Sequence, residues 1–148
     1  MVETEVKILV INGPNLNFLG IREKAIYGDR DYDSLINLIK SKAVEMGVEV
    51  DCFQSNHEGA IIDRIQAAYF DGTEGIVINP GAYSHYSYAI YDALNSVMIP
   101  KIEVHISDIA SRDEFRHKSV TAPACLMVIK GEGFDGYIHA MAELCKKI

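Results

Sequence analysis

The chain has 148 residues and a mass of 16.4 kDa, and it is 49% hydrophobic and 24% charged, which is typical of one globular domain spanning residues 1–148. Its 14 basic and 21 acidic residues give a net charge of −7. This acidity argues against a nucleic-acid partner and a polybasic membrane anchor, because both need a basic surface. It leaves small anionic ligands open, because a pocket can be locally positive on an acidic protein.

The N-terminal half of the chain alternates predicted strands with predicted helices. Residues 7–11 and 48–53 are short apolar segments rich in β-branched residues, which predicts strands. Asp33 or Ser34 can cap the helix between them, and Gly47 can end it. Its predicted inward face has apolar residues at helical spacing, namely Leu35, Leu38, Ile39, Ala43 and Met46. The next helix has its predicted inward face at Ile61, Ile65, Ala68 and Tyr69.

The C-terminal half continues the alternation, with strands predicted over residues 75–78, 99–106 and 124–129. Ser84 can cap the helix between the first two of these strands, and residues 113–118 predict a short helix. The helix after Ser84 is expected to bury Ile90, Ala93, Leu94 and Val97. The last helix is expected to bury Ile138, Met141, Ala142, Cys145 and Ile148.

This alternation predicts an α/β fold, an open five-stranded parallel sheet with helices on both faces. Such sheets bind ligands beyond the carboxyl ends of their strands, where the strand order reverses. Polar, turn-forming segments follow four predicted strands, at residues 12–15, 54–56, 79–82 and 105–108. One polar loop of this kind is ordinary, but four together favour a ligand site at this edge of the sheet.

The common cofactor motifs do not occur in the sequence. Neither a dinucleotide fingerprint nor a phosphate-binding loop follows the first strand, and Pro14 lacks the N–H group that a phosphate cradle needs. The five histidines have no metal-ligand spacing. The three cysteines are odd in number and far apart, which favours a reducing, cytoplasmic location over disulfides or a zinc site. We expect no signal peptide and no membrane helix, because the apolar segments are too short.

Two pairs of residues could provide acid–base chemistry. Arg22 and Tyr27 lie in a long connection over residues 19–28, whose length suggests a lid. A guanidinium beside a phenol favours the phenolate, which is a base, although Tyr27 could instead only pack the loop. Glu103 and His105 are two apart on a predicted strand, so they share a face and the carboxylate can orient the imidazole as a general acid. The alternative is a buried structural pair.

Arg112 and Arg116 are four residues apart and would share the face of a helix. They are either solvated charges or a pair that recognises an anion, because guanidinium groups match carboxylate and hydroxyl oxygens in a fixed geometry.

Seven motifs, taken together, resemble the type II 3-dehydroquinate dehydratase family. They occur in order along nearly the whole chain, at residues 8–17, 19–23, 27–28, 54–59, 78–83, 103–107 and 112–116. The resemblance implies a flavodoxin-like fold and no metal or organic cofactor. It also implies dehydration of the small anion 3-dehydroquinate to 3-dehydroshikimate by anti elimination through an enolate, in the shikimate pathway or in quinate catabolism.

The resemblance also implies a role for each site residue. Tyr27 would remove the proton beside the ketone, and Arg22 would stabilise its phenolate. Asn15 would help to hold a water that stabilises the enolate. His105 would protonate the departing hydroxyl, with Glu103 behind it. The implied substrate-binding groups are the side chains of Asn79, His85, Asp92 and Arg116 and the backbone amides of Ile106 and Ser107.

The family assembles as a dodecamer, a tetramer of trimers, so the resemblance implies that a neighbouring subunit completes each site, with Asp92 as the crossing residue. The chain departs from the family pattern at Lys24, Ser84, Tyr86 and Asp108. None of these is a proposed proton-transfer residue, so we expect activity, with possible effects on substrate affinity and the lid. Two alternatives stay open, a catalytically silent relative and a flavodoxin-like module that binds a small molecule.

Overall fold

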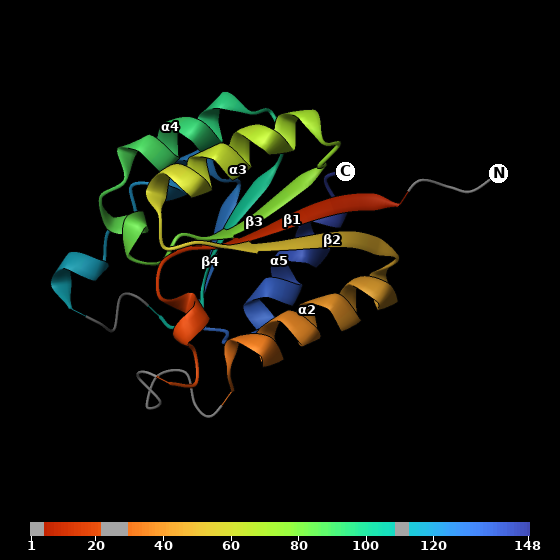
Figure 1. Cartoon of the computed structure of the whole chain (residues 1–148), viewed down its shortest axis with the longest axis horizontal. Coiled ribbons are helices and arrows are strands. Elements are labelled where there is room, and N and C mark those ends of the chain that lie inside the picture. Colours follow the sequence, from red (N-terminus) through yellow and green to blue (C-terminus); the bar gives the residue numbers. More distant parts are fainter. Residues whose placement is uncertain (1–4, 22–29, 109–112) are drawn as a thin grey trace.

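Five parallel strands form one sheet, as the sequence predicts, and their order is β2-β1-β3-β4-β5 (Figure 1). The computed structural model describes residues 5–21, 30–108 and 113–148. The strands are β1 (Val6–Asn12), β2 (Val48–Gln54), β3 (Gly75–Asn79), β4 (Lys101–His105) and β5 (Met127–Lys130). This is the flavodoxin-like order, and it reverses direction between β1 and β3.

Helices cover both faces of the sheet, and each pair buries its own apolar layer. These helices are α2 (Tyr32–Met46) and α5 (Asp135–Cys145) on one face, and α3 (Glu58–Phe70) and α4 (Tyr88–Ser96) on the other (Figure 1). Strand β1 contributes to both layers, because Ile8 and Val10 pack with α2 and α5 while Leu9 and Ile11 pack with α3 and α4. All four of these side chains are fully buried, which is why β1 is continuously apolar, as predicted.

The N-terminal caps of two helices differ from the predicted ones. Asp31 caps α2 in place of Asp33 or Ser34, because its carboxylate accepts bonds from the Ser34 N–H at 2.8 Å and the Ser34 hydroxyl at 2.7 Å. These bonds hold the pKa of the Asp31 carboxyl below its usual value. Ser87 caps α4, while the predicted cap Ser84 is buried in the 3-10 helix η2 (Gly81–His85).

The predicted inward face of α5 is shifted by about one residue from the observed one, although Met141 is buried as predicted and Ile138 and Cys145 are partly buried against the core. The helix buries Gly136, Tyr137, Ala140, Met141 and Leu144, whereas Ile148 is 42% exposed. Apolar residues occur on both sides of this helix, so periodicity alone does not select the face. The hydrogen bonds of the Tyr137 hydroxyl, described below, account for the side that is buried. Tyr69 on α3 was also expected to be inward and is 67% exposed.

In the C-terminal half, the last strand is shorter than predicted and a predicted helix is a single 3-10 turn. Strand β5 begins at Met127 and not at residue 124, because Ala124 is the last residue of the 3-10 helix η5 (Ala122–Ala124). The expected helix over residues 113–118 is the single 3-10 turn η4 (Glu114–Arg116). Among the residues that the structure describes, none of the helices has both the length and the apolar character needed to cross a membrane.

Candidate active site

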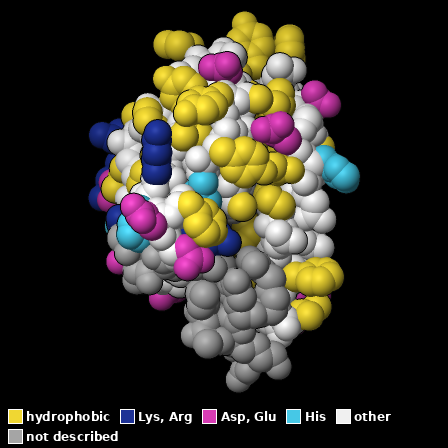
Figure 2. Space-filling view, turned by 90° about the vertical axis from the view of Figure 1, so that its left-hand side faces the viewer, with side chains coloured by type: hydrophobic (Ala, Val, Ile, Leu, Met, Phe, Trp, Pro, Cys, Tyr) yellow, Lys and Arg dark blue, Asp and Glu magenta, His cyan; other side chains and the backbone are white. Residues whose placement is uncertain are grey.

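Backbone hydrogen bonds join the loops that follow β1, β2 and β3 at the carboxyl edge of the sheet. The Gly13 N–H donates to the Asn79 carbonyl at 2.8 Å, and the Ser55 N–H donates to the Asn12 carbonyl at 3.1 Å. A Cβ atom at residue 13 would lie 2.3 Å from the Pro80 carbonyl oxygen, so only glycine fits there. Figure 2 looks onto this edge, where hydrophobic side chains cover much of the described surface.

A buried chain of three side chains lies beneath this edge, across the point where the strand order reverses. The Tyr137 hydroxyl donates to the Asn12 Oδ1 at 2.6 Å and accepts from the Asn79 Nδ2 at 2.9 Å. The Asn79 Oδ1 in turn accepts from the Gly81 N–H at 3.1 Å. Asn12 and Tyr137 are fully buried and Asn79 is 3% exposed. The orientation of the Asn79 amide is therefore set by a residue of α5.

We expect the Tyr137→Phe substitution to lower the free energy of unfolding by about 1–3 kcal/mol, because it leaves Asn12 and Asn79 each short of a buried hydrogen-bond partner. Urea unfolding measures this change. The matched control is Tyr69→Phe, since the Tyr69 side chain is 67% exposed. A loss for Tyr137→Phe no larger than for this control would contradict the prediction.

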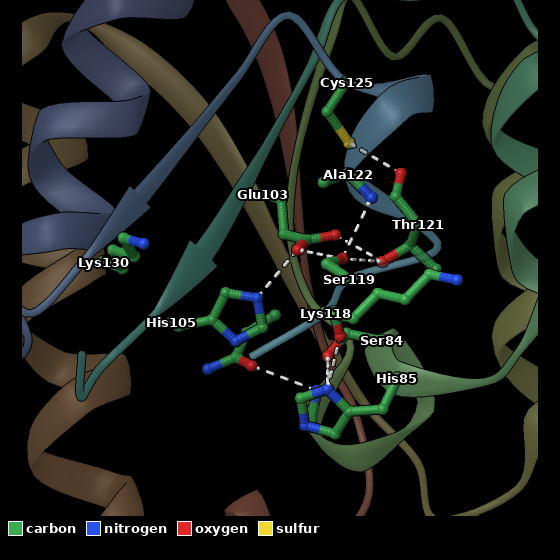
Figure 3. A network of polar contacts seen from close by, with 12 residues as sticks. Ser84, His85, Glu103, His105, Lys118, Ser119, Thr121, Ala122, Cys125 and Lys130 are labelled. Carbon is green, nitrogen blue, oxygen red and sulfur yellow. Dashed lines mark hydrogen bonds and ion pairs between the residues drawn. The ribbon is translucent and has the colours of Figure 1, made fainter. Parts of the chain in front are cut away.

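Glu103 and His105 lie on one face of β4, as predicted, and are in direct contact (Figure 3). The His105 Nε2 lies 2.7 Å from the Glu103 Oε2. Because a carboxylate only accepts, Nε2 carries the proton of this bond and Nδ1 is the nitrogen left on the other side of the ring. Glu103 is fully buried and His105 is 6% exposed. The arrangement is a histidine whose ring orientation is fixed by a buried carboxylate.

Two further hydroxyl groups contact the same carboxylate, and sequence reasoning missed both (Figure 3). The Ser119 hydroxyl donates to the Glu103 Oε2 at 2.7 Å, and the Thr121 hydroxyl donates to Oε1. No sequence motif indicates that Ser119 and Thr121 contact Glu103, because they follow it by 16 and 18 residues.

Burial, with the nearby Glu103 charge, raises the pKa of the Cys125 thiol to about 12. Cys125 is therefore a neutral thiol here and not a nucleophile.

His85 lies in η2, and a backbone carbonyl fixes its ring. The His85 Nδ1 is 2.8 Å from the Lys118 carbonyl oxygen, so Nδ1 carries a proton and Nε2 is an acceptor. The edge of the His85 ring faces Phe115 of η4, with 6.2 Å between the ring centroids. The Arg116 guanidinium stacks over Phe115 at 4.7 Å from the ring centroid. Turn η4 therefore places Arg116 near His85.

The other predicted site residues lie around this edge or outside the described residues. Asn15 follows β1 in a left-handed conformation with φ of 69°, and its N–H donates to the Asn56 side chain at 3.0 Å. Ile106 and Ser107 come directly after β4, whereas Asp92 lies on the exposed side of α4. Arg22, Lys24, Tyr27 and Arg112 lie outside the described residues, so their predicted roles, the lid over residues 19–28 and the pairing of Arg112 with Arg116 stay predictions.

Within residues 5–21, 30–108 and 113–148, no three His, Cys, Asp or Glu side chains are placed to hold a metal ion. The chemistry that the described arrangement offers is proton transfer through His105, beside amide and imidazole groups that can bind polar oxygens of a ligand.

Comparisons with known proteins give a consistent result. The family model described as Dehydroquinase class II matches residues 6–145. A protein of Lachnospira eligens named 3-dehydroquinate dehydratase is 62% identical over 137 residues, which are 92% of this chain and 93% of that protein. One of the same name from Lachnoclostridium phytofermentans is 65% identical over 136 residues, 92% and 94% of the two chains. The solved type II dehydroquinase of Butyrivibrio crossotus is 64% identical, with a TM-score of 0.94 over 95% of this chain and 98% of that one.

Proposed function

Because this chain belongs to the class II dehydroquinase family and catalyses its reaction, the dehydration of 3-dehydroquinate in the shikimate pathway, we propose that its residues divide the elimination into two proton transfers. The observation that carries this proposal is the buried Glu103–His105 pair at the ligand edge of the sheet, with Nε2 of the imidazole bonded to the carboxylate. A histidine held in one orientation by its Nε2–H bond can deliver a proton from Nδ1 in a fixed direction when the ring is an imidazolium.

In the first step, Tyr27 removes the proton beside the ketone as a phenolate that Arg22 stabilises. The electron pair of the broken C–H bond moves to the carbonyl oxygen and forms an enolate. A water held with the help of Asn15 stabilises the enolate oxygen. Asn15 is suited to this task because its backbone is fixed by the bond to Asn56 in the loop after β2.

In the second step, the enolate collapses and the C–O bond of the leaving hydroxyl breaks. His105, acting as an imidazolium whose Nε2–H is bonded to Glu103, gives its Nδ1 proton to the departing oxygen, which leaves as water. The product is a conjugated enone, and the elimination is anti because base and acid act from opposite faces of the ring. Glu103 keeps the imidazole oriented throughout, since it is fully buried and bonded to Nε2.

The remaining groups take the substrate-binding roles that the family resemblance implies. The backbone N–H groups of Ile106 and Ser107, just beyond β4, hold the substrate carboxylate. The His85 Nε2 accepts from a ring hydroxyl, since its Nδ1 proton is used by Lys118, and Arg116 and Asn79 bind other ring oxygens. These groups come from the loops after β3 and β4, on one edge of the sheet.

The assembly we propose is a dodecamer built from four trimers, in which Asp92 of one subunit completes the site of another. Asp92 is exposed on α4, and near the start of that helix Tyr86 and Tyr88 are 60% and 63% exposed. These features are compatible with a covered surface. We further propose a cytoplasmic location, supported by the three free thiols of Cys52, Cys125 and Cys145.

One purified preparation, dialysed against a chelator, tests the activity and the assembly. We expect 3-dehydroquinate to be converted with no added metal, which the rise in ultraviolet absorbance of the conjugated enone measures, and sedimentation to give the mass of twelve chains. A folded sample that produces no absorbance rise above the uncatalysed rate would instead support a catalytically silent protein. A single small species in sedimentation, with full activity, would remove the proposed crossing role of Asp92.

A further inference from the structure

The Glu103 carboxylate is completely enclosed, and three side chains donate hydrogen bonds to it. His105 Nε2 and the Ser119 hydroxyl both donate to Oε2 at 2.7 Å, and the Thr121 hydroxyl donates to Oε1. Glu103 and Thr121 have no exposed surface. A carboxylate that leaves water needs such donors, because burying it without partners costs several kcal/mol.

The direction of the Ser119 hydroxyl is fixed by its other contact. The Ala122 N–H donates to the Ser119 Oγ at 3.0 Å and so occupies it as an acceptor. The hydroxyl hydrogen is then directed to Glu103, and the neighbouring Thr121 hydroxyl, 3.1 Å away, lies beside it over the other carboxylate oxygen. The turn that begins η5 therefore orients both donors before any substrate arrives.

We propose that Ser119 and Thr121 are positioning residues of the dehydration reaction. They hold both oxygens of Glu103 in place as acceptors, and Glu103 thereby holds His105 with its Nδ1 directed at the leaving hydroxyl. This inference rests on the proposed role of His105 as the acid. The physical reason is that an acid displaced by a fraction of an ångström, or turned away, transfers its proton more slowly although the substrate still binds.

Residues 118–121 also contact His85, so this one short segment orients both His85 and Glu103 (Figure 3). The Lys118 carbonyl accepts from the His85 Nδ1 at 2.8 Å, and the Val120 N–H donates to the Ser84 carbonyl at 2.6 Å. Backbone groups at 118 and 120 therefore bond to η2, while side chains at 119 and 121 bond to Glu103. The two contacts are separable, because the side chains can be changed without removing the backbone bonds.

The test compares steady-state kinetics of Ser119→Ala and Thr121→Val with those of Thr121→Ser, which keeps the hydroxyl. We expect the first two to lower kcat about 10- to 100-fold, with KM changed by less than about threefold, and Thr121→Ser to keep kcat within about threefold of the wild type. Ser41→Ala is the matched control, since Ser41 is exposed on α2, away from the residues proposed for the site. Thermal unfolding checks that each variant is folded.

A double-mutant cycle shows whether the two hydroxyls act through Glu103. In a Glu103→Gln background there is no carboxylate to hold, so Ser119→Ala and Thr121→Val should have little further effect on kcat. Fully additive losses would overturn the inference, as would a wild-type kcat for both single variants while His105→Gln is inactive. If His105→Gln itself keeps its activity, the acid role of His105 fails instead. Should Ser119→Ala not fold, the comparison of Thr121→Ser with Thr121→Val decides the matter.

Discussion

The Tyr27→Phe enzyme is expected to fold normally and to lose about 10²–10⁴-fold in kcat. The substitution removes one oxygen atom, and with it the group that we propose takes the proton beside the ketone. A positioned general base contributes about 10²–10⁴-fold. The remaining groups of the site cannot replace it, because His105 already has the opposite task of giving a proton. Steady-state turnover of 3-dehydroquinate measures the effect.

Tyr69→Phe is the control for this substitution, because it makes the same chemical change at a side chain that is 67% exposed on α3. It should leave kcat unchanged. A Tyr27→Phe enzyme that retains activity within a few-fold of the wild type would remove Tyr27 from the role of base. The same loss of activity with a changed melting temperature would point instead to a tyrosine that only packs its loop.

The second large effect is expected for His105→Gln, which should lower kcat about 10²–10⁴-fold while proton abstraction continues. Glutamine can keep a hydrogen bond to Glu103 but cannot deliver a proton to the leaving hydroxyl. The enolate should therefore form and return to substrate many times before it eliminates. In deuterated water, nuclear magnetic resonance should show exchange of the substrate proton by His105→Gln and none by Tyr27→Phe.

This pair of measurements separates the two proton transfers. His139→Gln serves as the control, because His139 lies on the exposed side of α5, where its partners are Glu132 and Glu143. A His105→Gln enzyme that neither dehydrates nor exchanges would mean that His105 is needed before the enolate forms. Full dehydration activity would make the Glu103–His105 pair a structural feature of β4.

Local sequence rules predicted the sheet and one side of the active site. Continuous apolar character identified β1 and β3 as strands buried on both faces, and the period of two placed Glu103 and His105 on one face of β4. Spacing was less informative where several residues could make the same local bond. Asp31 caps α2 although Asp33 and Ser34 are equally suitable by type, because only its carboxylate reaches the free N–H group.

The residues that the sequence did not reveal are the ones whose partners are distant along the chain. Ser119 and Thr121 are ordinary polar residues until the fold brings them to Glu103, and Tyr137 reads as one of several apolar positions on α5. Periodicity describes a residue's neighbours on the same element and contains no information about contacts between elements. The roles of Tyr27 and Arg22 rest on the family motifs, which were the more specific signal.

The hydrogen bonds of Tyr137 have a consequence for the chain as it is synthesised. The Tyr137 hydroxyl bonds to Asn12 across 125 residues and to Asn79 across 58 residues, and β1 itself lies at the centre of the sheet although it is translated first. A chain growing from its N-terminus can pair β1 with β2 and β3 early. Asn12 and Asn79 gain their shared hydrogen-bond partner, Tyr137, only after α5 has left the ribosome. The ligand edge is therefore completed only once α5 has been synthesised, and a chain released before that point carries the central strands of the enzyme without its finished site.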